Sequence, residues 1–504
     1  MLDGILEGLC GGLWQGALLP CVFLFGLYAT LRTRFFQVTR FPRMLRETFG
    51  GLFGKSSESE GSVTPFQALC TALAGTVGTG SVVGTCQAVA VGGPGALFWM
   101  WIAAFFGMII KFFEVTLATL YRQINKDGEW VGGPMYYILR GMGPRFKPLG
   151  AAFALFALFS SLGMGCLAQA SGVVDGVRST VAVLLPEAVS DGLLPLGVGI
   201  TMGIVLAFAL SRGAVRVGRV AEILVPVACS FFLILTIGVI WHHRARLGET
   251  LGMILRCAFS GKALFGAGAG IGVKKALEWG LRRSAFSNEA GLGSAAIAHA
   301  SAKTPHPVHQ GFFGMFEVFA DTLVVCSLTG LSVLITIPPE EILSRPTPDA
   351  TLIVSAVSTL IGPAAARVSI GLSLALFAFS TLLGWSLYGA RCARFLFGKT
   401  GERLYRPVFV LCAVLGSVFA ATSIWALSDL FNALMAIPNF IALIVLFPRV
   451  TEQMADYFAE ERKRRRNAFS LKKDLTQPPE CGKLSPAKDR TAPRSGRLPR
   501  SIQN

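Results

Sequence analysis

The chain contains 504 residues, of which 53% are hydrophobic and only 15% are charged, and its mean hydropathy is +0.58. Soluble domains carry about 25% charged residues, and a soluble chain of this length would need such charge to cover two or three domains. The composition therefore argues against a soluble protein, and the high hydrophobicity excludes a disordered chain. A membrane protein with many spans remains.

The charge balance and the cysteines narrow the class further. Lysine and arginine total 46 against 29 acidic residues, which gives a net charge of +17. Such an excess can indicate nucleic-acid binding, but it is also typical of cytoplasmic loops that face an anionic membrane surface. Most of the 11 cysteines lie in apolar runs without CxxC spacing, so they are interpreted as small hydrophobic side chains rather than as a disulfide or metal framework.

Long apolar runs recur along the whole chain. A helix needs about 20 apolar residues to cross a bilayer. Eleven runs are candidates, at residues 11–31, 66–91, 96–120, 150–170, 195–211, 219–241, 264–299, 311–337, 367–391, 406–424 and 427–447. The sequence therefore predicts an all-α multi-pass membrane protein with 11 transmembrane helices.

Basic residues predict the orientation of these spans. Lysine and arginine are concentrated in the segments 32–65, 121–149 and 391–406, which fall on one side if the N-terminus is outside. The C-terminal tail then lies in the cytoplasm, where we expect the run Glu460–Arg466 (EERKRRR) to contact anionic lipid rather than nucleic acid. Beyond about residue 467 the composition predicts disorder.

Two of the eleven runs are not typical helices. The second contains Ala74–Ser81 (AGTVGTGS), and the seventh contains Gly266–Gly272 (GAGAGIG) and Phe286–Ser294 (FSNEAGLGS). Each interior glycine costs a helix roughly 1 kcal/mol relative to alanine. Unwound backbone inside a bilayer is tolerated only where it is buried in protein or lines a cavity. We therefore predict two discontinuous helices.

The spacing of the two broken runs predicts an internal repeat. Apart from the first run, they are the first and sixth of ten, and an offset of five spans reverses topology. This is the pattern of a five-plus-five inverted repeat with one extra N-terminal helix. The predicted parts are an N-terminal helix and basic loop (1–65), a first repeat (66–241), an inverted second repeat (264–447) and a basic, disordered tail (448–504).

A broken helix exposes two kinds of backbone group in mid-membrane. Free N–H groups attract an anion such as a carboxylate, and free carbonyls suit a hard cation such as sodium. The segment Gly78–Gly80 has the small residues that allow a carboxylate to approach the backbone. The two breaks together could bind a zwitterion and a cation.

Polar side chains inside apolar spans are further candidates. Gln169 has no local hydrogen-bond partner, so it is a candidate substrate ligand. Ser380 and Thr381 could bind a ligand or simply bond to the preceding helical turn. Asp321 could be a proton or ion ligand or a helix–helix hydrogen-bond acceptor. For Glu114, the favoured interpretation is a structural ion pair with Lys111, one turn away.

Several motifs together resemble the alanine or glycine:cation symporter family (sodium:alanine symporters) of the amino acid-polyamine-organocation superfamily. The resemblance covers roughly residues 10–450. The motifs are Val77–Gly80 (VGTG), Gly92–Trp101 (GGPGALFWMW), Gly132–Tyr137 (GGPMYY), Phe286–Ser294 (FSNEAGLGS), Asp321–Cys326 (DTLVVC) and Phe379–Trp385 (FSTLLGW). The resemblance implies a leucine-transporter-like five-plus-five fold, in agreement with the spacing argument.

The resemblance also implies a role for individual residues. The implied substrate-binding residues are Gly78, Thr79, Gly80, Gln169, Asn288, Gly291 and Trp385, with Thr79 and Gly80 offering N–H groups to the substrate carboxylate. The implied sodium ligands are the carbonyls of Ala74 and Val77 and the hydroxyls of Ser380 and Thr381. Many family members carry Asn where this chain has Ser81, which keeps an oxygen but lacks the amide, so the exact substrate and the coupling ion stay open.

The expected function is sodium-driven uptake of a small neutral amino acid by a monomer in the bacterial inner membrane. We expect no enzyme activity, because no catalytic set is visible, and no cofactor beyond sodium as the coupling ion. One alternative is a proton-coupled carrier of the same fold, in which Asp321 or Glu289 titrates. Another is a sensor or channel whose tail carries the signal. Uptake without sodium, or loss of function on truncation of residues 452–504, would distinguish them.

Overall fold

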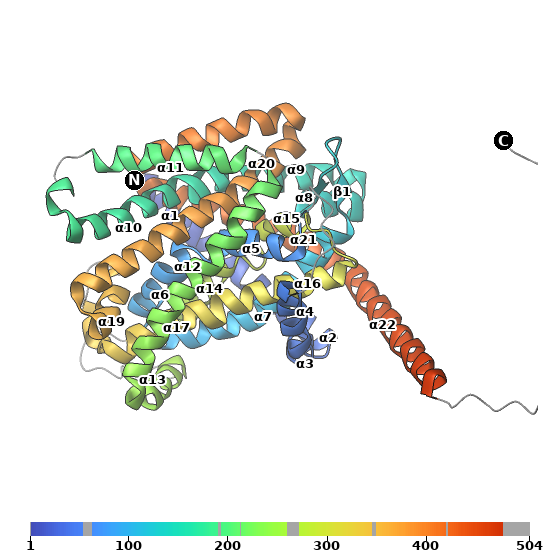
Figure 1. The fold of residues 1–504 in the computed structure, drawn as a ribbon, viewed down its shortest axis with the longest axis horizontal. Helices are drawn as coiled ribbons and strands as arrows, with labels where there is room; N and C mark the ends of the chain where they lie inside the picture. The colour runs from blue at the N-terminus through green and yellow to red at the C-terminus, as the bar shows by residue number, and fades with distance from the viewer. Residues whose placement is uncertain are drawn as a thin grey trace, which may run out of the picture. The chain divides into compact units, whose positions relative to one another are not determined.

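The structure is a computed structural model, and it describes residues 2–53, 63–189, 193–211, 213–259, 272–344, 349–419 and 422–476. It is almost entirely helical in these ranges (Figure 1). The one sheet in the described part is an antiparallel pair of short strands, β1 (Gln123–Ile124) and β2 (Trp130–Val131). The chain divides into two compact units, residues 1–454 and 455–504.

Helices before the second predicted break include three π-helical segments and three 3₁₀ turns. They are α1 (Leu2–Leu13), η1 (Trp14–Leu18), α2 (Leu19–Arg32), α3 (Phe36–Thr39), α4 (Phe41–Phe53), α5 (Pro65–Thr76), α6 (Thr79–Gly92), α7 (Gly95–Leu120), α8 (Pro134–Tyr137), η2 (Ile138–Met142), η3 (Pro144–Phe146), α9 (Lys147–Leu162), η4 (Gly163–Leu167), α10 (Ala168–Leu184), η5 (Pro186–Val189), α11 (Leu194–Leu210), α12 (Ala214–His242), η6 (Arg244–Arg246) and α13 (Leu247–Phe259).

The remaining helices begin at the seventh predicted span. They are α14 (Val273–Asn288), α15 (Ser294–His299), α16 (Pro307–Val318), the π-helical η7 (Phe319–Cys326), α17 (Ser327–Thr336), α18 (Pro339–Ser344), α19 (Thr351–Ile361), α20 (Pro363–Val418), α21 (Thr422–Val445) and α22 (Phe447–Thr476). The predicted glycine cluster at Gly266–Gly272 lies outside the described residues except for Gly272.

Seven helices in the described ranges are long and apolar enough to cross a membrane, and the bent pair α5–α6 makes eight. The chain is therefore a multi-pass membrane protein, while the number of eleven spans and the inverted repeat stay predictions. The predicted spans 367–391 and 406–424 correspond to two helical halves of α20, although the second half ends at Val418 rather than at residue 424. Gly398 (φ 69°) has a non-helical backbone within α20 and separates the two halves.

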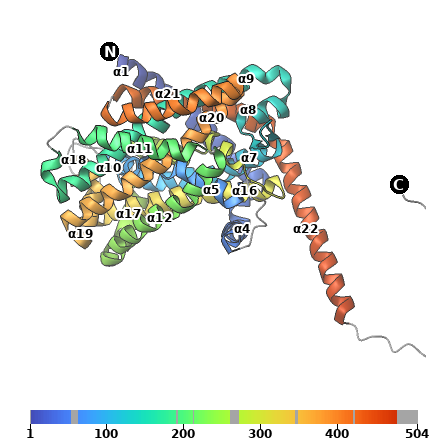
Figure 2. The ribbon, with the colours of Figure 1, turned by 45° about the horizontal axis from the view of Figure 1, so that its top comes forward.

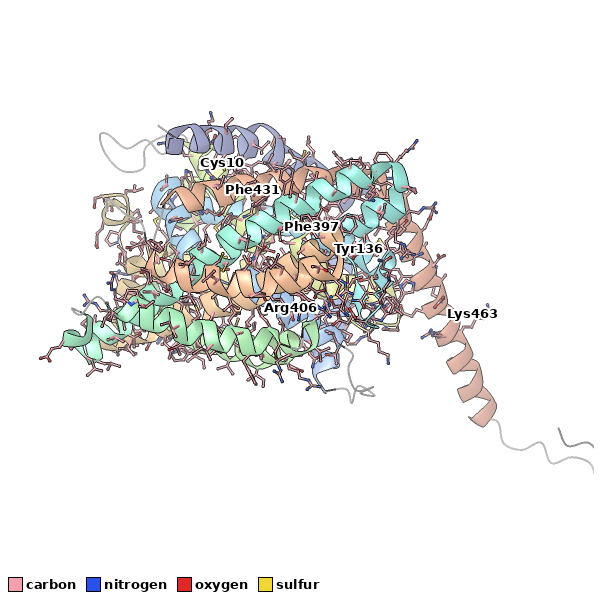
Figure 3. The ribbon with its side chains drawn as sticks, turned by 90° about the horizontal axis from the view of Figure 1, so that it is seen from above. Cys10, Tyr136, Phe397, Arg406, Phe431 and Lys463 are labelled. Atoms are coloured by element: carbon pink, nitrogen blue, oxygen red, sulfur yellow. The ribbon has the colours of Figure 1, made fainter. Side chains whose placement is uncertain are left out.

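The core is built where apolar helices with small residues pack closely. α7 lies against α14 and α16, and α10 lies along α20 (Figure 2). On the other side of the unit, α1 packs on α21, and Figure 3 labels Cys10 and Phe431 on these two helices. Gly384 of α20 faces α5 so closely that a Cβ atom there would lie 2.7 Å from the Gly75 nitrogen. The result is a dense, side-chain-filled bundle around α5 and α7.

The tail differs from its prediction. The sequence predicted a disordered segment from residue 448, whereas α22 is helical through Thr476. Its charged residues are good helix formers, and Arg464 pairs with Glu460 one turn away at 3.7 Å. Local propensity and such pairs favour helix despite the low hydrophobicity. Residues 477–504 of the predicted tail lie outside the described residues.

Candidate functional site

The first predicted break is present between α5 and α6. α5 begins with a capping box, in which Thr64 and Gln67 each bond the other's backbone N–H. It ends at Thr76 because Val77 (ψ 89°) and Gly78 (ψ −161°) leave the helical region, and α6 begins at Thr79 with its axis bent by 42°. The last carbonyls of α5 and the first N–H groups of α6 therefore lack helical partners.

Gly78 lies against the middle of α20. A Cβ atom at this position would lie 2.5 Å from the Thr381 hydroxyl oxygen, well inside van der Waals contact. Only glycine therefore allows Thr381 to approach the backbone of the break. The structure thus brings together Gly78 and Thr381, one predicted substrate residue and one predicted sodium ligand.

Thr79, the first residue of α6, contacts the predicted substrate ligand on α10. Its hydroxyl donates to the side-chain oxygen of Gln169 at 3.0 Å. Gln169 is 2% exposed and follows the π-helical segment η4, in which an extra residue per turn re-aims the side chains. Thr79 and Gln169, which are 90 positions apart, therefore form one polar pair at the first break.

The two hydroxyls of α20 make local bonds. Ser380 and Thr381 donate to the Phe377 carbonyl at 2.8 and 3.0 Å, as the simpler alternative from the sequence anticipated. A hydroxyl that donates in this way keeps oxygen lone pairs for a cation. Ala74 and Val77, the other predicted sodium ligands, are buried at the end of α5. Their carbonyls are among the backbone groups that the break leaves without helical partners.

The second predicted break spans Glu289–Gly293, between α14 and α15. Glu289 (φ 54°) is left-handed, as are Gly291 (φ 92°) and Gly293 (φ 78°). Asn288 ends α14, and its side-chain oxygen accepts from the N–H of Ala290 at 3.0 Å. This local bond favours a turn over continued helix. The chain therefore leaves the helix at the position that the SNEAGLGS motif predicted.

The predicted substrate residues of the second break already form hydrogen bonds with other residues of the chain. The amide nitrogen of Asn288 donates to Ser284 at 3.2 Å and to Thr322 at 3.0 Å. The N–H of Gly291 donates to Glu114 of α7 at 3.0 Å. The structure therefore does not join Asn288 or Gly291 directly to Thr79 and Gln169.

A buried carboxylate links the two breaks instead. Asp321 of η7 accepts from the hydroxyls of Ser81 at 2.5 Å, Ser287 at 2.7 Å and Thr322 at 2.9 Å. Ser287 also donates to Ser81 at 3.0 Å, so α6, α14 and η7 meet at this point. Asp321 is thus a helix–helix hydrogen-bond acceptor, and its role as an ion or proton ligand stays a prediction.

Aromatic side chains of α20 cover the region next to the first break. Trp385 is fully buried, and a Cβ atom on Gly165 would lie 2.5 Å from it. Its ring meets that of Tyr388 edge to face, with centroids 5.5 Å apart. The indole N–H and the Tyr388 hydroxyl are both buried without a hydrogen-bond partner in the described residues. The Trp385 indole also faces the Glu289 carboxyl group of the second break.

The ion pair predicted for Glu114 is part of a larger group. Lys111 lies 4.0 Å from Glu114 but only 3.5 Å from Glu317, a residue that sequence reasoning missed. Glu317 also contacts His299 at 3.1 Å. The sequence did contain a signal for Glu317, because it precedes Asp321 by four residues and so shares its helix face.

Sequence analysis also missed Tyr388. This residue follows Thr381 and Trp385 at helical spacing and lies on the same face of α20.

The chain is similar to known transport proteins along most of its length. Residues 1–471 match the sodium:alanine symporter family. The chain is 38% identical to the sodium/alanine symporter AgcS of Methanococcus maripaludis, over 86% of this chain and 92% of that protein. It is 35% identical to a probable sodium/glutamine symporter, GlnT of Bacillus subtilis, over 89% of each.

A solved structure shares the fold. The crystal structure of MhsT in complex with L-phenylalanine covers 78% of this chain and 90% of that chain with a TM-score of 0.55, at 12% sequence identity. Matches of this extent agree with the buried breaks, the apolar spans and the motifs. The chain is therefore a multi-pass amino-acid transporter that belongs to the sodium:alanine symporter family.

Proposed function

We propose that the chain is a secondary active symporter that takes up a small neutral amino acid of the alanine and glycine class with sodium, by alternating access. The observation that carries this proposal is the first break, where Gly78 lies against Thr381 and Thr79 bonds Gln169. Unpaired backbone groups of both polarities meet polar side chains of α10 and α20 there. Such a place suits a zwitterion and a cation together.

The substrate side of the site uses backbone N–H groups. Those of Thr79 and Gly80 lie in the first turn of α6, where the helix dipole also favours a carboxylate. Gln169 then faces the polar part of the substrate, and the buried Trp385 limits the space for its side chain. Asn288 and Gly291 would complete the pocket from the second break once their present hydrogen bonds rearrange.

The sodium side uses oxygen atoms. The carbonyls of Ala74 and Val77 and the hydroxyls of Ser380 and Thr381 are hard ligands of the kind that sodium prefers. Each elementary charge that moves inward across 100 mV contributes about 2.3 kcal/mol, so one sodium ion can drive substantial accumulation. Two relatives, a sodium/alanine symporter and a probable sodium/glutamine symporter, support sodium as the coupling ion.

The proposal includes the arrangement in the membrane. We place eleven spans in a five-plus-five inverted repeat, with the N-terminus outside and the C-terminus in the cytoplasm of a bacterial inner membrane. The basic residues of α22, such as Lys463 (labelled in Figure 3), would contact anionic lipid. The transporter would act as a monomer.

Uptake into proteoliposomes tests the function. Radiolabelled alanine should accumulate with an inward sodium gradient and should not accumulate when potassium replaces sodium on both sides. Unlabelled glycine, alanine, serine, glutamine and phenylalanine should compete with the labelled alanine, and the competition should weaken as the side chain becomes larger. Uptake that is indifferent to both sodium and proton gradients would refute symport, and uptake driven by pH alone would favour the proton-coupled alternative.

A further inference from the structure

Five ionisable side chains are buried together at the second break. Lys111 and Glu114 come from α7, Glu289 from the break itself, His299 from α15 and Glu317 from α16, and all five are 0–1% exposed. We call them the Lys111 cluster. The proposed sodium site contains none of them. A group of this size in a membrane-embedded core needs mutual compensation of charge or protonation.

Two of the three carboxyl groups share the single lysine. Lys111 Nζ lies 3.5 Å from Glu317 Oε1 and 4.0 Å from Glu114 Oε2. The second oxygen of Glu317 lies 3.1 Å from His299 Nε2, and His299 Nδ1 lies 2.9 Å from Gln310. Glu317 therefore has a cation on one oxygen and an imidazole on the other.

Glu114 is compensated in a different way. Its Oε1 accepts from the N–H of Gly291 at 3.0 Å and from the side-chain amide of Asn439 at 2.5 Å. Asn439 also donates to the Gly291 carbonyl at 2.8 Å and bonds the Tyr137 hydroxyl. Glu114 thus holds the backbone of the break with an oxygen that has two donors.

Glu289 is compensated more weakly than the other two carboxyl groups, because Lys111 acts on it only from beyond ion-pair distance. Its Oε2 accepts a bond from the Ser294 hydroxyl, but its Oε1 has no hydrogen-bond partner in the described residues. Among the ion pairs of those residues, none joins Glu289 to a cation within 4.0 Å. From α20, the indole N–H of Trp385 is directed at this carboxyl group and Tyr388 lies near it, and neither side chain carries charge.

A count of the charges in the Lys111 cluster leaves Glu289 without a cation to compensate it. With neutral His299 the cluster has one cation and three carboxyl groups. A protonated His299 would compensate Glu317 and Lys111 would compensate Glu114, which still leaves Glu289. Asp321, the next carboxylate along η7, adds negative charge nearby and is already bound by three hydroxyls. An isolated ionised carboxylate without water or a cation is costly, and such a group takes up a proton instead.

The backbone of Glu289 has an unusual conformation, which links the protonation of its side chain to the geometry of the break. Its φ of 54° makes it one of three non-glycine residues with positive φ in the described chain. A left-handed backbone is strained for a non-glycine residue, and such residues tend to occur at functional and switching sites. The Ser294 bond spans the break from the other side. Ionisation of Glu289 would therefore change the forces that hold the break in this geometry.

We propose that Glu289 is a proton-binding site at the second break, protonated on Oε1 in the geometry described above, and that it exchanges this proton when sodium and amino acid bind. In the exchange, the O–H bond of the carboxyl group breaks and the proton passes to water or a buffer base, with no other bond changed. The identity of the ligands that drive the exchange, sodium and an amino acid, rests on the proposed function. The proton site itself does not depend on that function.

Calorimetry of the full-length protein tests the exchange. Alanine is titrated into the purified protein in sodium, in buffers with different heats of ionisation, at several values from mildly acidic to mildly alkaline pH. The dependence of the measured heat on the buffer gives the number of protons exchanged. We expect a number different from zero in the unmodified protein and none for Glu289→Gln, which mimics the protonated form.

Glu222→Gln is the matched control. Glu222 of α12 is half-buried, accepts from Gln67 at 2.9 Å and lies outside both the cluster and the proposed site, so this variant should exchange protons as the unmodified protein does. Buffer-independent heats in the unmodified protein at every pH, or unchanged exchange in Glu289→Gln, would overturn the proposal.

Infrared spectroscopy decides the case if Glu289→Gln does not fold or if alanine does not bind. Unmodified protein carrying ¹³C-labelled glutamate should show a carboxylic-acid carbonyl band that shifts with the label and disappears on alkaline titration. Absence of a label-sensitive band at neutral pH would refute the proton site. A band together with no amino-acid binding would leave the proton site standing and refute the proposed substrate.

Discussion

The two breaks differ in how the protein treats the backbone that they expose. The first is a two-residue interruption, and its neighbours Thr79, Gln169 and Thr381 form a small polar group. The second spans five residues, and its backbone is bound by Glu114 and Asn439. One break leaves groups for a ligand, whereas the other is closed by the protein itself. The difference shows that an interrupted helix is not by itself a binding site, because its partners decide the outcome.

The largest expected effect concerns the closed break. Lys111→Met removes the only lysine of the cluster and leaves buried carboxylates uncompensated. Loss of one partner from a buried ion pair costs about 3–5 kcal/mol, so the melting temperature in detergent should fall sharply. Lys274→Met is the control, since the Lys274 side chain is 86% exposed and pairs with Glu278 at 3.8 Å. Equal melting temperatures for the two variants would show that the cluster does not stabilise the break.

The next effect concerns the open break. Gly78→Ala places a Cβ atom 2.5 Å from the Thr381 hydroxyl oxygen and must displace the Thr381 side chain. Overpacking costs about 1–3 kcal/mol, which corresponds to about fivefold to 150-fold weaker alanine binding if the whole cost falls on the bound state. Gly197→Ala, where a Cβ atom meets nothing within 4 Å, should bind normally. Unchanged sodium-dependent alanine binding in Gly78→Ala would separate the break from the substrate.

A smaller effect is expected for the polar pair. Thr79→Val removes the 3.0 Å bond to Gln169 and leaves the shape of the side chain. A lost hydrogen bond costs about 0.5–1.5 kcal/mol, so the apparent affinity for alanine should fall by up to about tenfold. Thr201→Val is a suitable control because Thr201 is exposed and bonds only its own helix, at Gly197. If both variants transport alike, the Thr79–Gln169 pair does not contribute to binding.

The smallest effect is expected for an exposed group of charges around Asp127, which provides a comparison for the buried Lys111 cluster. Asp127 lies in the turn between β1 and β2 and pairs with Arg394 at 2.6 Å and with Lys399. Hydrogen bonds from Lys399 and Arg394 lower the pKa of this carboxyl from 3.8 to about 2. Because the folded pKa is depressed, its stabilisation is complete above pH 3.8 and is lost as pH falls toward 2.

Asp127→Asn should therefore change thermal stability only slightly at neutral pH, and high salt should remove even that difference, because exposed pairs are screened. NMR titration of the labelled Asp127 carboxyl carbon measures the pKa directly. A large, salt-independent loss of stability would show that exposed and buried clusters behave alike, against the comparison drawn above.

Local sequence was sufficient to locate both breaks. Gly78 and Gly291 lie within clusters of small and polar residues that disfavour helix whatever surrounds them, so the interruptions could be predicted. The family resemblance named Thr79 and Gln169 as substrate residues, but the hydrogen bond between them was not predicted. Such contacts between distant segments depend on packing, which a single sequence does not report.

The Lys111 cluster shows the limit most clearly. Lys111 and Glu114 are one turn apart, so their pairing was predictable, but the closer partner Glu317 is more than 200 positions away. Hydropathy does indicate that each charge in a span needs compensation. It does not say which of several charges will meet.

The close approach of Gly75 and Gly384 has a mechanical consequence. With no side chains between them, the backbones of α5 and α20 touch, so the piece that ends at the first break is tethered to the piece that carries Thr381 and Trp385. A larger residue at Gly75 or Gly384 would therefore displace α5 from the part of α20 that carries Thr381 and Trp385. Gly398, where the backbone leaves the helix, separates that part from the rest of α20.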